Sequence, residues 1–435
     1  MTPISNTQYA IQNITLLALG SRGDVQPFVA LGLGLRAAGF QVRIAAAEDY
    51  RDIVEPYGLD FAPLVGSIRD FMDRQMIYSL LDEPENPLRF ITGMMDAVRP
   101  LIVRLVADVY SACRHADAVF VSTLGYYGGY DVAQALNIPV YVAHLHPNVP
   151  TRAYPHVFLP HLPPWLPAFV RALYNRLGHK LTEAAYWAFI LGPLNQARRE
   201  VLGLPPLLPL DIMDRIGAPL RPVLHAYSPL LTRTPPDWGR DVHVTGYWFV
   251  DEPPGWAPDP DLVSFLDAGE PPVYVGFGSN LVGRDPDRIT RLVLGALRRT
   301  GQRGIISSGW GDLGNIDLPD TVYKVESVPH SWLFRKVRAV VSHSGAGTLG
   351  ATLRAGVPPI TVPFFGDQLF WSARVARLGL GPEPIPRRHL SEDRLAAAIG
   401  QAIDDKSMRA RAALTGKLIS QERGIENALQ ALGWA

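Results

Sequence analysis

The stretch Val340-Val341-Ser342-His343-Ser344-Gly345-Ala346-Gly347-Thr348 has the pattern of a buried strand that passes through a small-residue turn into a helix over residues 349–355. The first turn of a helix presents free backbone N–H groups at the positive end of its dipole, and glycines let an anion approach the backbone closely. We therefore expect this turn to hold a diphosphate. The groups expected to contact it belong to His343, Ser344, Gly345, Gly347 and Thr348.

The same turn leaves two alternatives open. It contains a literal G-x-G-x-x-G from Gly345 to Gly350, and Asp367 follows at about the distance at which dinucleotide-binding folds place a ribose-binding acid. A nicotinamide-dependent dehydrogenase is therefore one competing interpretation. However, Gln368 follows Asp367 directly, and this pair of acceptor and donor groups suits sugar hydroxyls. The second alternative is a tight strand-to-helix turn without a ligand.

Strands and helices alternate on both sides of this turn. Apolar runs that predict strands lie at 14–19, 42–46, 118–122 and 139–143 in the first half, and at 273–277, 304–307, 322–325, 339–342 and 359–362 in the second. Helical patterns cover 28–38, 169–201, 286–299 and 348–355. This order predicts two α/β domains with parallel sheets covered on both faces. Ligands bind beyond the carboxyl ends of such strands, so the interdomain cleft is the expected site.

Two further turns follow predicted strands. Residues 20–27, Gly-Ser-Arg-Gly-Asp-Val-Gln-Pro, come after the first strand and would enter the cleft from the opposite side. Asp24 there is either a general base, ionised at pH 7 because an unperturbed Asp has a pKa of about 3.9, or a cap of the following helix. Gly278 and Ser279 end the strand at 273–277 and either contact phosphate or form a plain turn.

Composition excludes several classes of protein. Lys+Arg and Asp+Glu are 41 each in 435 residues, so there is no basic excess for nucleic acid. Cys113 is the only cysteine, which excludes an internal disulfide and fits a reducing compartment. The apolar runs are shorter than the roughly 20 residues of a transmembrane helix. We expect a cytoplasmic protein, with peripheral membrane contact through residues 162–170; the oligomeric state is not indicated.

Taken together, these segments resemble the inverting glycosyltransferase family 1, and within it the sterol 3β-glucosyltransferases. The resemblance covers nearly the whole chain. It is carried by residues 20–27, 237–239, 274–279, 301–306, 309–311, 328–334, 343–348, 363–368 and 381–382. It implies the GT-B fold, in which two Rossmann-like α/β domains face a deep interdomain cleft.

The resemblance also implies which segments of the chain form which domain. Residues 1–230 would form an acceptor-binding domain, 231–260 a linker region, and 261–415 a domain that binds the nucleotide-sugar donor. A helix over residues 416–435 would pack back on the first domain. The reaction implied is transfer of a hexose, with glucose favoured, from a nucleotide diphosphate sugar to a hydroxyl of a sterol or sterol-like acceptor. No metal or other cofactor is expected; the donor is a co-substrate, UDP-glucose being favoured over a dTDP-sugar.

Roles transfer from the family to matching positions. Asp24 would be the catalytic base. The implied donor-binding set is Ser21, Arg22, Gly278, Ser279, Val328, His343, Ser344, Gly345, Gly347, Thr348, Asp367 and Gln368. The implied acceptor-binding set is His146, Asn148, Tyr154, Phe158 and Trp165, of which the aromatic residues have plain core packing as their alternative.

Three departures keep other functions open. Related enzymes commonly read His-His-Gly-Gly-Ala-Gly-Thr, whereas Ser342 replaces the first histidine here, which leaves a non-catalytic nucleotide-sugar-binding protein as an alternative. Ser327 and Ala351 stand where plant members carry a Trp that stacks on uracil and a Glu that binds ribose. The acceptor loop, residues 146–151, lacks the aromatic of the sterol enzymes, so polyketide, macrolide and other natural-product acceptors also fit. A nucleotide-sugar epimerase is a further two-domain alternative.

Overall fold

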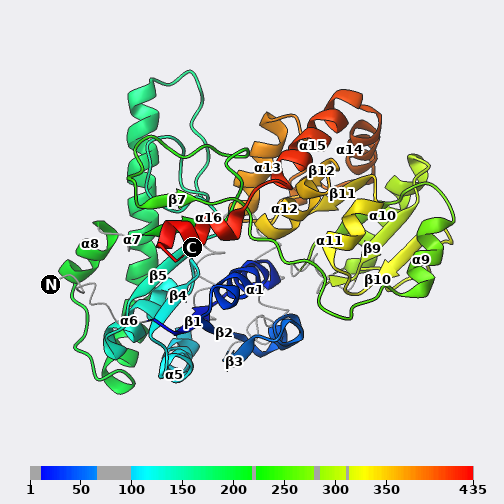
Figure 1. Ribbon diagram of the computed structural model, residues 1–435. Helices are drawn as coiled ribbons and strands as arrows, with labels where there is room; N and C mark the ends of the chain where they lie inside the picture. The colour runs from blue at the N-terminus through cyan, green and yellow to red at the C-terminus, as the bar shows by residue number, and fades with distance from the viewer. Residues whose placement is uncertain (1–10, 66–98, 218–221, 279–284, 310–312, 435) are drawn as a thin grey trace.

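Two parallel sheets, one in each half of the chain, form the frame of the molecule (Figure 1). The computed structural model describes residues 11–65, 99–217, 222–278, 285–309 and 313–434. The first sheet has the strand order β3-β2-β1-β4-β5-β6-β7, and all its pairs are parallel. Its strands are β1 Asn13–Leu17, β2 Gln41–Ala47, β3 Asp60–Leu64, β4 Ala118–Val121, β5 Val140–His144, β6 Val223–His225 and β7 Val242–Val244.

The second sheet has the order β10-β9-β8-β11-β12 and is also parallel throughout. Its strands are β8 Val273–Gly276, β9 Gly304–Ser307, β10 Val322–Val325, β11 Ala339–Ser342 and β12 Pro359–Thr361. All four residues of β4 and of β11 are buried, as expected for central strands of sheets covered on both faces. The two-domain parallel α/β architecture predicted from the sequence is therefore confirmed.

Helices cover both faces of each sheet. In the first half they are α1 Arg22–Ala37, α5 Ile102–Cys113, α6 Tyr126–Leu136, α7 Ala168–Glu200 and α8 Pro209–Gly217. In the second half they are α9 Pro260–Asp267, α10 Pro286–Arg299, α11 His330–Leu333, α12 Ala346–Arg354, α13 Asp367–Arg377, α14 Glu392–Asp404, α15 Lys406–Ile419 and α16 Gly424–Leu432. Short 3₁₀ helices span Glu48–Ile53, Glu55–Tyr57, Arg99–Leu101, Phe334–Lys336 and Arg387–His389.

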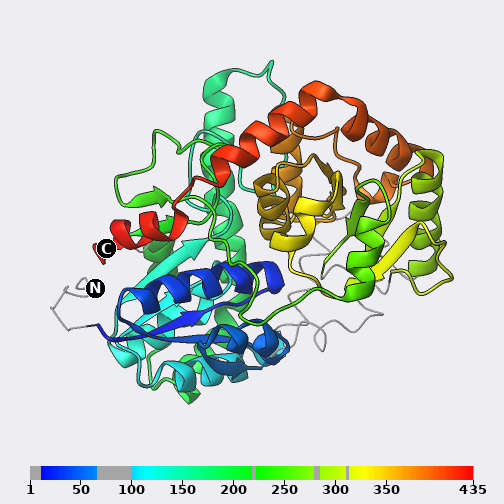
Figure 2. The same ribbon diagram turned by 45° about the vertical axis from the view of Figure 1, so that its right-hand side comes forward.

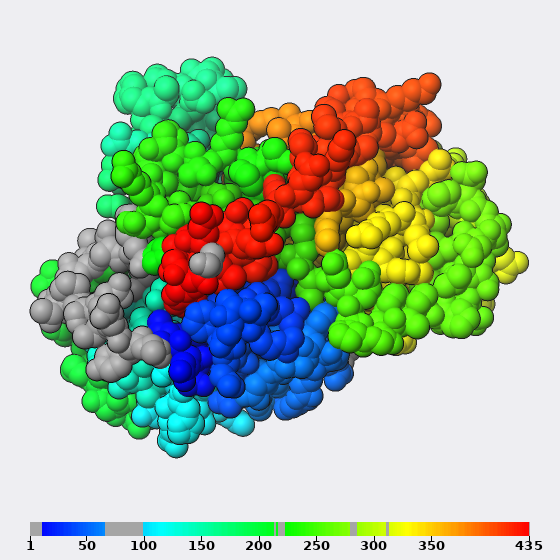
Figure 3. Space-filling view, viewed as in Figure 1, coloured from blue at the N-terminus to red at the C-terminus, as the bar shows by residue number. Residues whose placement is uncertain are grey.

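The chain returns to the first domain at its C-terminal end. After α15, helix α16 lies against α1, as Figures 2 and 3 show where the red segment meets the blue one. A Cβ atom on Gly34 of α1 would lie 2.2 Å from Cγ2 of Ile425, so only glycine allows this close approach. Ala428 and Leu429 of α16 belong to the same buried apolar cluster as α1.

Some elements differ from the sequence-based expectation. Helix α1 begins at Arg22 rather than at residue 28, because Ser21 and Asp24 cap it, so Asp24 lies in its first turn and not in a loop. Strand β7 lies inside the segment expected to be a linker, and it extends the first sheet. β3, β6 and β7 were not predicted, since β6 and β7 have only three residues each and β3 contains a proline. Within the described residues, no helix is long and apolar enough to cross a membrane.

Candidate active site

The turn after β11 leaves an open helix N-terminus. Gly345 is the N-cap of α12 and no side chain caps the helix, so the N–H groups of its first turn have no side-chain acceptor. Ala346 and Gly347 of this turn line the cleft. Ser344 adopts a left-handed backbone conformation with φ of +67°, and its buried hydroxyl has no hydrogen-bond partner. An uncapped helix start beside an unsatisfied hydroxyl is a suitable site for an anion.

His343 is held between two glycines at this turn. A Cβ atom on Gly278 would lie 3.0 Å from Cε1 of His343, and one on Gly345 would lie 2.4 Å from its Nε2. Burial lowers the pKa of His343 to about 4, so the imidazole is neutral at pH 7 and offers one N–H donor. Its Nδ1 is buried without a hydrogen-bond partner. Ser279, the other predicted contact next to Gly278, lies outside the described residues.

Asp24 lies on the other side of the cleft and caps its own helix. Its Oδ2 accepts hydrogen bonds from the backbone N–H of Ser21, at 2.6 Å, and from the Ser21 hydroxyl, at 2.9 Å. A Cβ atom on Gly20 would lie 2.3 Å from the same Oδ2, so the turn requires glycine there. The pKa of Asp24 is raised to about 6, mainly by burial and to a smaller extent by the charge of Asp367, while the two hydrogen bonds from Ser21 and the nearby His146 act to lower it. A carboxylate with this pKa is well matched to a base that acts near neutral pH.

The two helix starts face each other across the domains. A Cβ atom on Gly347 would lie 3.5 Å from the Cα of Gly23, so α12 and α1 approach closely at their first turns. Beside this contact, Nη1 of Arg22 donates a hydrogen bond of 2.9 Å to the hydroxyl of Ser327. A cleft of about 330 Å³ opens here, and Ser327 and Ala351 both line it. Val328 is half-buried and packs on the apolar cluster beneath α11.

Asp367 and Gln368 begin α13 on the same side as α12. Oδ2 of Asp367 accepts a hydrogen bond of 3.2 Å from the indole N–H of Trp371, and burial raises its pKa to about 6. Oε1 of Gln368 accepts the backbone N–H groups of Phe364 and Phe365 at 2.9 and 3.3 Å. Gln368 therefore shapes the loop before Asp367, so its oxygen is engaged by the backbone.

The predicted acceptor residues divide into two groups. His146 interacts electrostatically with Asp24, and the side chain of Asn148 forms a hydrogen bond with His146. Phe158 reaches the second domain, because a Cβ atom on Gly366 would lie 3.1 Å from its Cε1. Tyr154, in contrast, is a buried core residue that packs edge-on against Phe370 of α13 at 5.6 Å between ring centroids. Trp165 is 78% exposed, so it is a surface residue.

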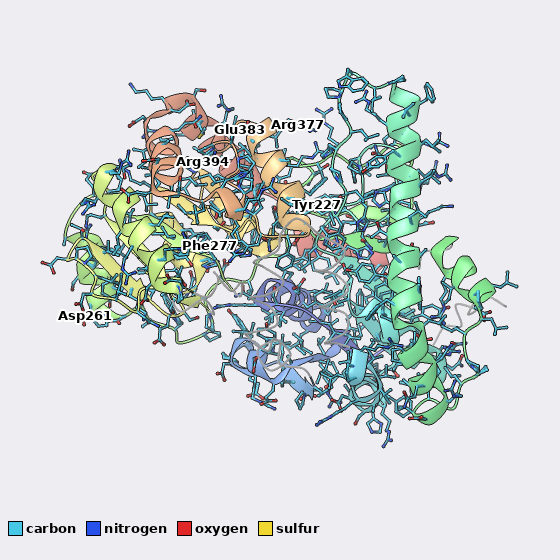
Figure 4. The ribbon with its side chains drawn as sticks, turned by 180° about the vertical axis from the view of Figure 1, so that it is seen from behind. Tyr227, Asp261, Phe277, Arg377, Glu383 and Arg394 are labelled. Atoms are coloured by element: carbon cyan, nitrogen blue, oxygen red, sulfur yellow. The ribbon has the colours of Figure 1, made fainter. Side chains whose placement is uncertain are left out.

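The sequence did not predict that the connecting segment after β7 forms part of the cleft. Tyr247, Trp248, Asp251 and Trp256 line the cleft, and the Tyr247 ring packs under Gly350, where a Cβ atom would lie 2.7 Å from the ring. Arg354 at the end of α12 pairs with Asp251 at 2.7 Å. The Pro- and Trp-rich composition of this segment suggested only a linker. Tyr227, labelled in Figure 4, packs edge-on against Trp371 of α13 at 5.4 Å between ring centroids, a further contact between the two halves of the chain.

No group of three His, Cys, Asp or Glu side chains able to hold a metal ion occurs among the residues that the structure describes.

Two family models match opposite ends of this arrangement. Residues 14–155 match the N-terminal domain of glycosyltransferase family 28, and residues 307–424 match the erythromycin biosynthesis protein CIII-like C-terminal domain. The first match contains Asp24. The second contains Asp367 and the turn at residues 342–348, which we call the anion turn. Together with the relatives below, these matches support the predicted resemblance to glycosyltransferases at both ends of the chain.

Two curated relatives show which glycosyltransferases this chain is similar to. The chain is 35% identical over 444 residues to a sterol 3-beta-glucosyltransferase of Cryptococcus neoformans, a match covering 96% of this chain and 27% of that protein. It is 36% identical over 429 residues to a sterol 3-beta-glucosyltransferase of Arabidopsis thaliana, covering 96% of this chain and 64% of that one. The chain therefore spans between about a quarter and two thirds of these curated relatives.

Solved structures share the fold at lower identity. The calicheamicin glycosyltransferase CalG4 superposes with a TM-score of 0.66 at 17% identity, covering 97% of this chain and 98% of that one. Glycosyltransferase VinC, in complex with dTDP, gives a TM-score of 0.61 at 18% identity, covering 97% and 99%. These likenesses confirm the GT-B fold.

Proposed function

We propose that this protein transfers glucose from a nucleotide diphosphate sugar to a hydroxyl group of a sterol or sterol-like acceptor, with inversion at the anomeric carbon. The observation that carries this proposal is the opposition of two helix starts, one with an open N-terminus and one with a carboxylate, at the Gly23 and Gly347 contact. The sterol acceptor and the glucose follow from the relatives that are sterol 3-beta-glucosyltransferases.

In this proposal the N-terminus of α12 binds the diphosphate, with donors from His343, Ser344 and Thr348. The nucleoside occupies the cleft beside Ser327 and Ala351, and Asp367 with Gln368 lies at the sugar. The second domain is thus the donor domain, and the first domain, with His146, Asn148 and Phe158, holds the acceptor.

The reaction is a single displacement. The carboxylate of Asp24 accepts the proton of the acceptor hydroxyl, whose oxygen forms the new bond to the anomeric carbon. The bond from that carbon to the diphosphate oxygen breaks, and its electron pair leaves with the diphosphate. Helix N–H groups and the neutral His343 would stabilise the charge that develops on the leaving group, which is the kind of preorganised electrostatic assistance that contributes most in many enzymes.

A second candidate acceptor class is a polyketide or other natural-product aglycone. It is favoured by the loop at residues 146–151, which lacks the aromatic of the sterol enzymes, and by the match of residues 307–424 to an erythromycin biosynthesis domain. A dTDP-sugar would be the matching donor, as the VinC complex with dTDP suggests.

The test is a coupled assay for release of UDP or dTDP, with UDP- and dTDP-sugars each supplied with and without sterol and polyketide acceptors, and mass detection of products. We expect sterol-dependent UDP release and a mass increase of one hexose on the sterol. Turnover with a polyketide and a dTDP-sugar alone would favour the second candidate. Nucleotide binding without release from any pair would indicate a binding protein, and conversion of the donor without an acceptor would indicate an epimerase.

A further inference from the structure

The first half of α7 carries large apolar side chains that face solvent. Phe169, Leu173, Leu177 and Leu181 follow one another at four-residue intervals, and their exposed fractions are 74%, 58%, 47% and 69%. Side chains four residues apart lie on the same side of a helix, so the four form a continuous row. Trp165, just before the helix, is 78% exposed. We call these five residues the apolar stripe.

The stripe is not the packing face of α7. Asn175, Gly178 and His179 on the opposite side are buried, and a Cβ atom on Gly178 would lie 2.4 Å from Cδ1 of Leu159 in the preceding loop. The first half of α7 is therefore anchored by its inner face, while its outer face projects beyond the body of the molecule (Figures 1 and 4). Contiguous apolar surface of this kind marks an interaction site on soluble domains.

Positive charges accompany the stripe. Arg176 and Lys180 are exposed, and each follows a leucine of the stripe by three residues, which places it on the same face. No Asp or Glu occurs from residue 151 to residue 182. The next carboxyl group, Glu183, is half-buried, and burial raises its pKa to about 7. A row of leucines with Trp at its end and Arg and Lys alongside has the composition that binds anionic membrane surfaces, where long basic side chains reach the headgroups.

The stripe is also connected to the interdomain site. The loop between β5 and α7 holds Trp165 at one end, and Phe158, in the same loop, contacts Gly366 next to Asp367. The same loop thus joins the stripe to the residues next to Asp367.

We infer that the apolar stripe docks this protein on the surface of an anionic lipid bilayer, with Arg176 and Lys180 at the lipid phosphates. Docking itself rests on the exposed side chains and their charge. Delivery of a membrane-dissolved acceptor to the cleft rests in addition on the function proposed above.

Flotation with phosphatidylcholine vesicles, prepared with and without phosphatidylserine, tests the docking without any need for turnover. The wild-type protein should float with the anionic vesicles and much less with the neutral ones. Leu173→Gln/Leu177→Gln should weaken binding by at least about tenfold, because two large side chains no longer enter the apolar layer. Arg176→Glu/Lys180→Glu should abolish the preference for phosphatidylserine.

The matched control is Leu414→Gln/Leu418→Gln, a pair on α15 with the same spacing and exposed fractions of 60% and 42%. It should float as the wild type does. Absence of flotation of the wild type, or equal loss in the control pair, overturns the inference. So does a shift from dimer to monomer in Leu173→Gln/Leu177→Gln during sedimentation without vesicles, which would identify the stripe as a contact between two copies of the chain.

Two further assays separate this inference from the proposed function. With a detergent-dispersed sterol, Leu173→Gln/Leu177→Gln should transfer glucose at the wild-type rate, whereas with a vesicle-embedded sterol it should lose most of its activity. A wild-type protein that floats but transfers no sugar in either assay would leave the docking intact and contradict only the function.

Discussion

Two strand-to-helix turns meet at the centre of this molecule, and they treat their helix N-termini in opposite ways. The turn after β1 closes its helix with a capping box, in which Asp24 accepts from Ser21. The turn after β11 gives α12 no side-chain cap and leaves the buried Ser344 hydroxyl and Nδ1 of His343 without partners. A helix that carries its own carboxylate has little attraction for a further anion, whereas an open one attracts it. In the function proposed above, the capped turn would supply the base and the open turn would bind the diphosphate.

The largest effect should come from the carboxylate of the capped turn. Asp24→Asn keeps the size of the side chain and can still accept from Ser21, but it cannot take a proton at neutral pH. We expect kcat to fall by about 10²- to 10⁴-fold, the usual contribution of a general base, with nucleotide affinity nearly unchanged.

Ser21→Ala is the matched control, because it removes the hydroxyl that donates to Asp24 while leaving the carboxylate. It should lower stability by about 1 kcal/mol through the lost cap and reduce kcat by less than tenfold. If Asp24→Asn retains a tenth of the wild-type rate, Asp24 acts only as a cap.

In the open turn, His343→Ala removes a buried N–H donor. Loss of a hydrogen bond to a charged group costs roughly 1–3 kcal/mol, so kcat/KM for the donor should fall by about 5- to 150-fold. Steady-state kinetics with varied donor measure this, and His389→Ala, an exposed histidine in the same half, is the control. Unchanged donor kinetics in His343→Ala would remove this residue from the diphosphate site.

The pH dependence of kcat/KM should show the electrostatic interaction between Asp24 in the first domain and Asp367 in the second. Asp24 must be ionised to act, and burial raises its pKa to about 6, so kcat/KM should decline as the pH falls through 6 rather than through 4. Because the charge of Asp367 contributes to this rise, Asp367→Asn should move the acidic limb to lower pH, whatever it does to the plateau. An acidic limb near pH 4, or one that Asp367→Asn leaves in place, would contradict this electrostatic picture.

The smallest effect concerns the strain in the open turn. Ser344 stands where related enzymes have glycine, and its φ of +67° costs a side-chain-bearing residue about 1 kcal/mol. Ser344→Gly should therefore raise the free energy of unfolding by about that amount and lift the melting temperature measured by calorimetry. A lower melting temperature would mean that the Ser344 hydroxyl stabilises the turn. A rise in donor KM in this variant would support its predicted contact with the diphosphate.

The two strand-to-helix turns could be predicted more completely from the sequence than the residues that line the cleft. The anion turn is one continuous segment, so its strand, glycines and helix could be predicted from the residues in order, and all five strands of the second sheet were predicted. The start of α1 was placed too late, because Pro27 was taken to lie in its first turn.

The cleft walls could not be predicted in the same way. Tyr247 and Ser327 are far apart in the sequence and become neighbours of α12 only through the packing of the two domains. Phe158 meets Gly366 for the same reason. Tyr154 and Trp165 have similar apolar character, and only the fold makes one a core residue and the other a surface residue.

The most direct test of the account is the anomeric configuration of the product, determined by NMR after reaction of UDP-α-glucose with a sterol. A single displacement, with Asp24 on one side of the sugar and the diphosphate at α12 on the other, predicts a β-linked glucoside. An α-linked product would contradict it, because retention requires a second displacement or attack from the side of the leaving group.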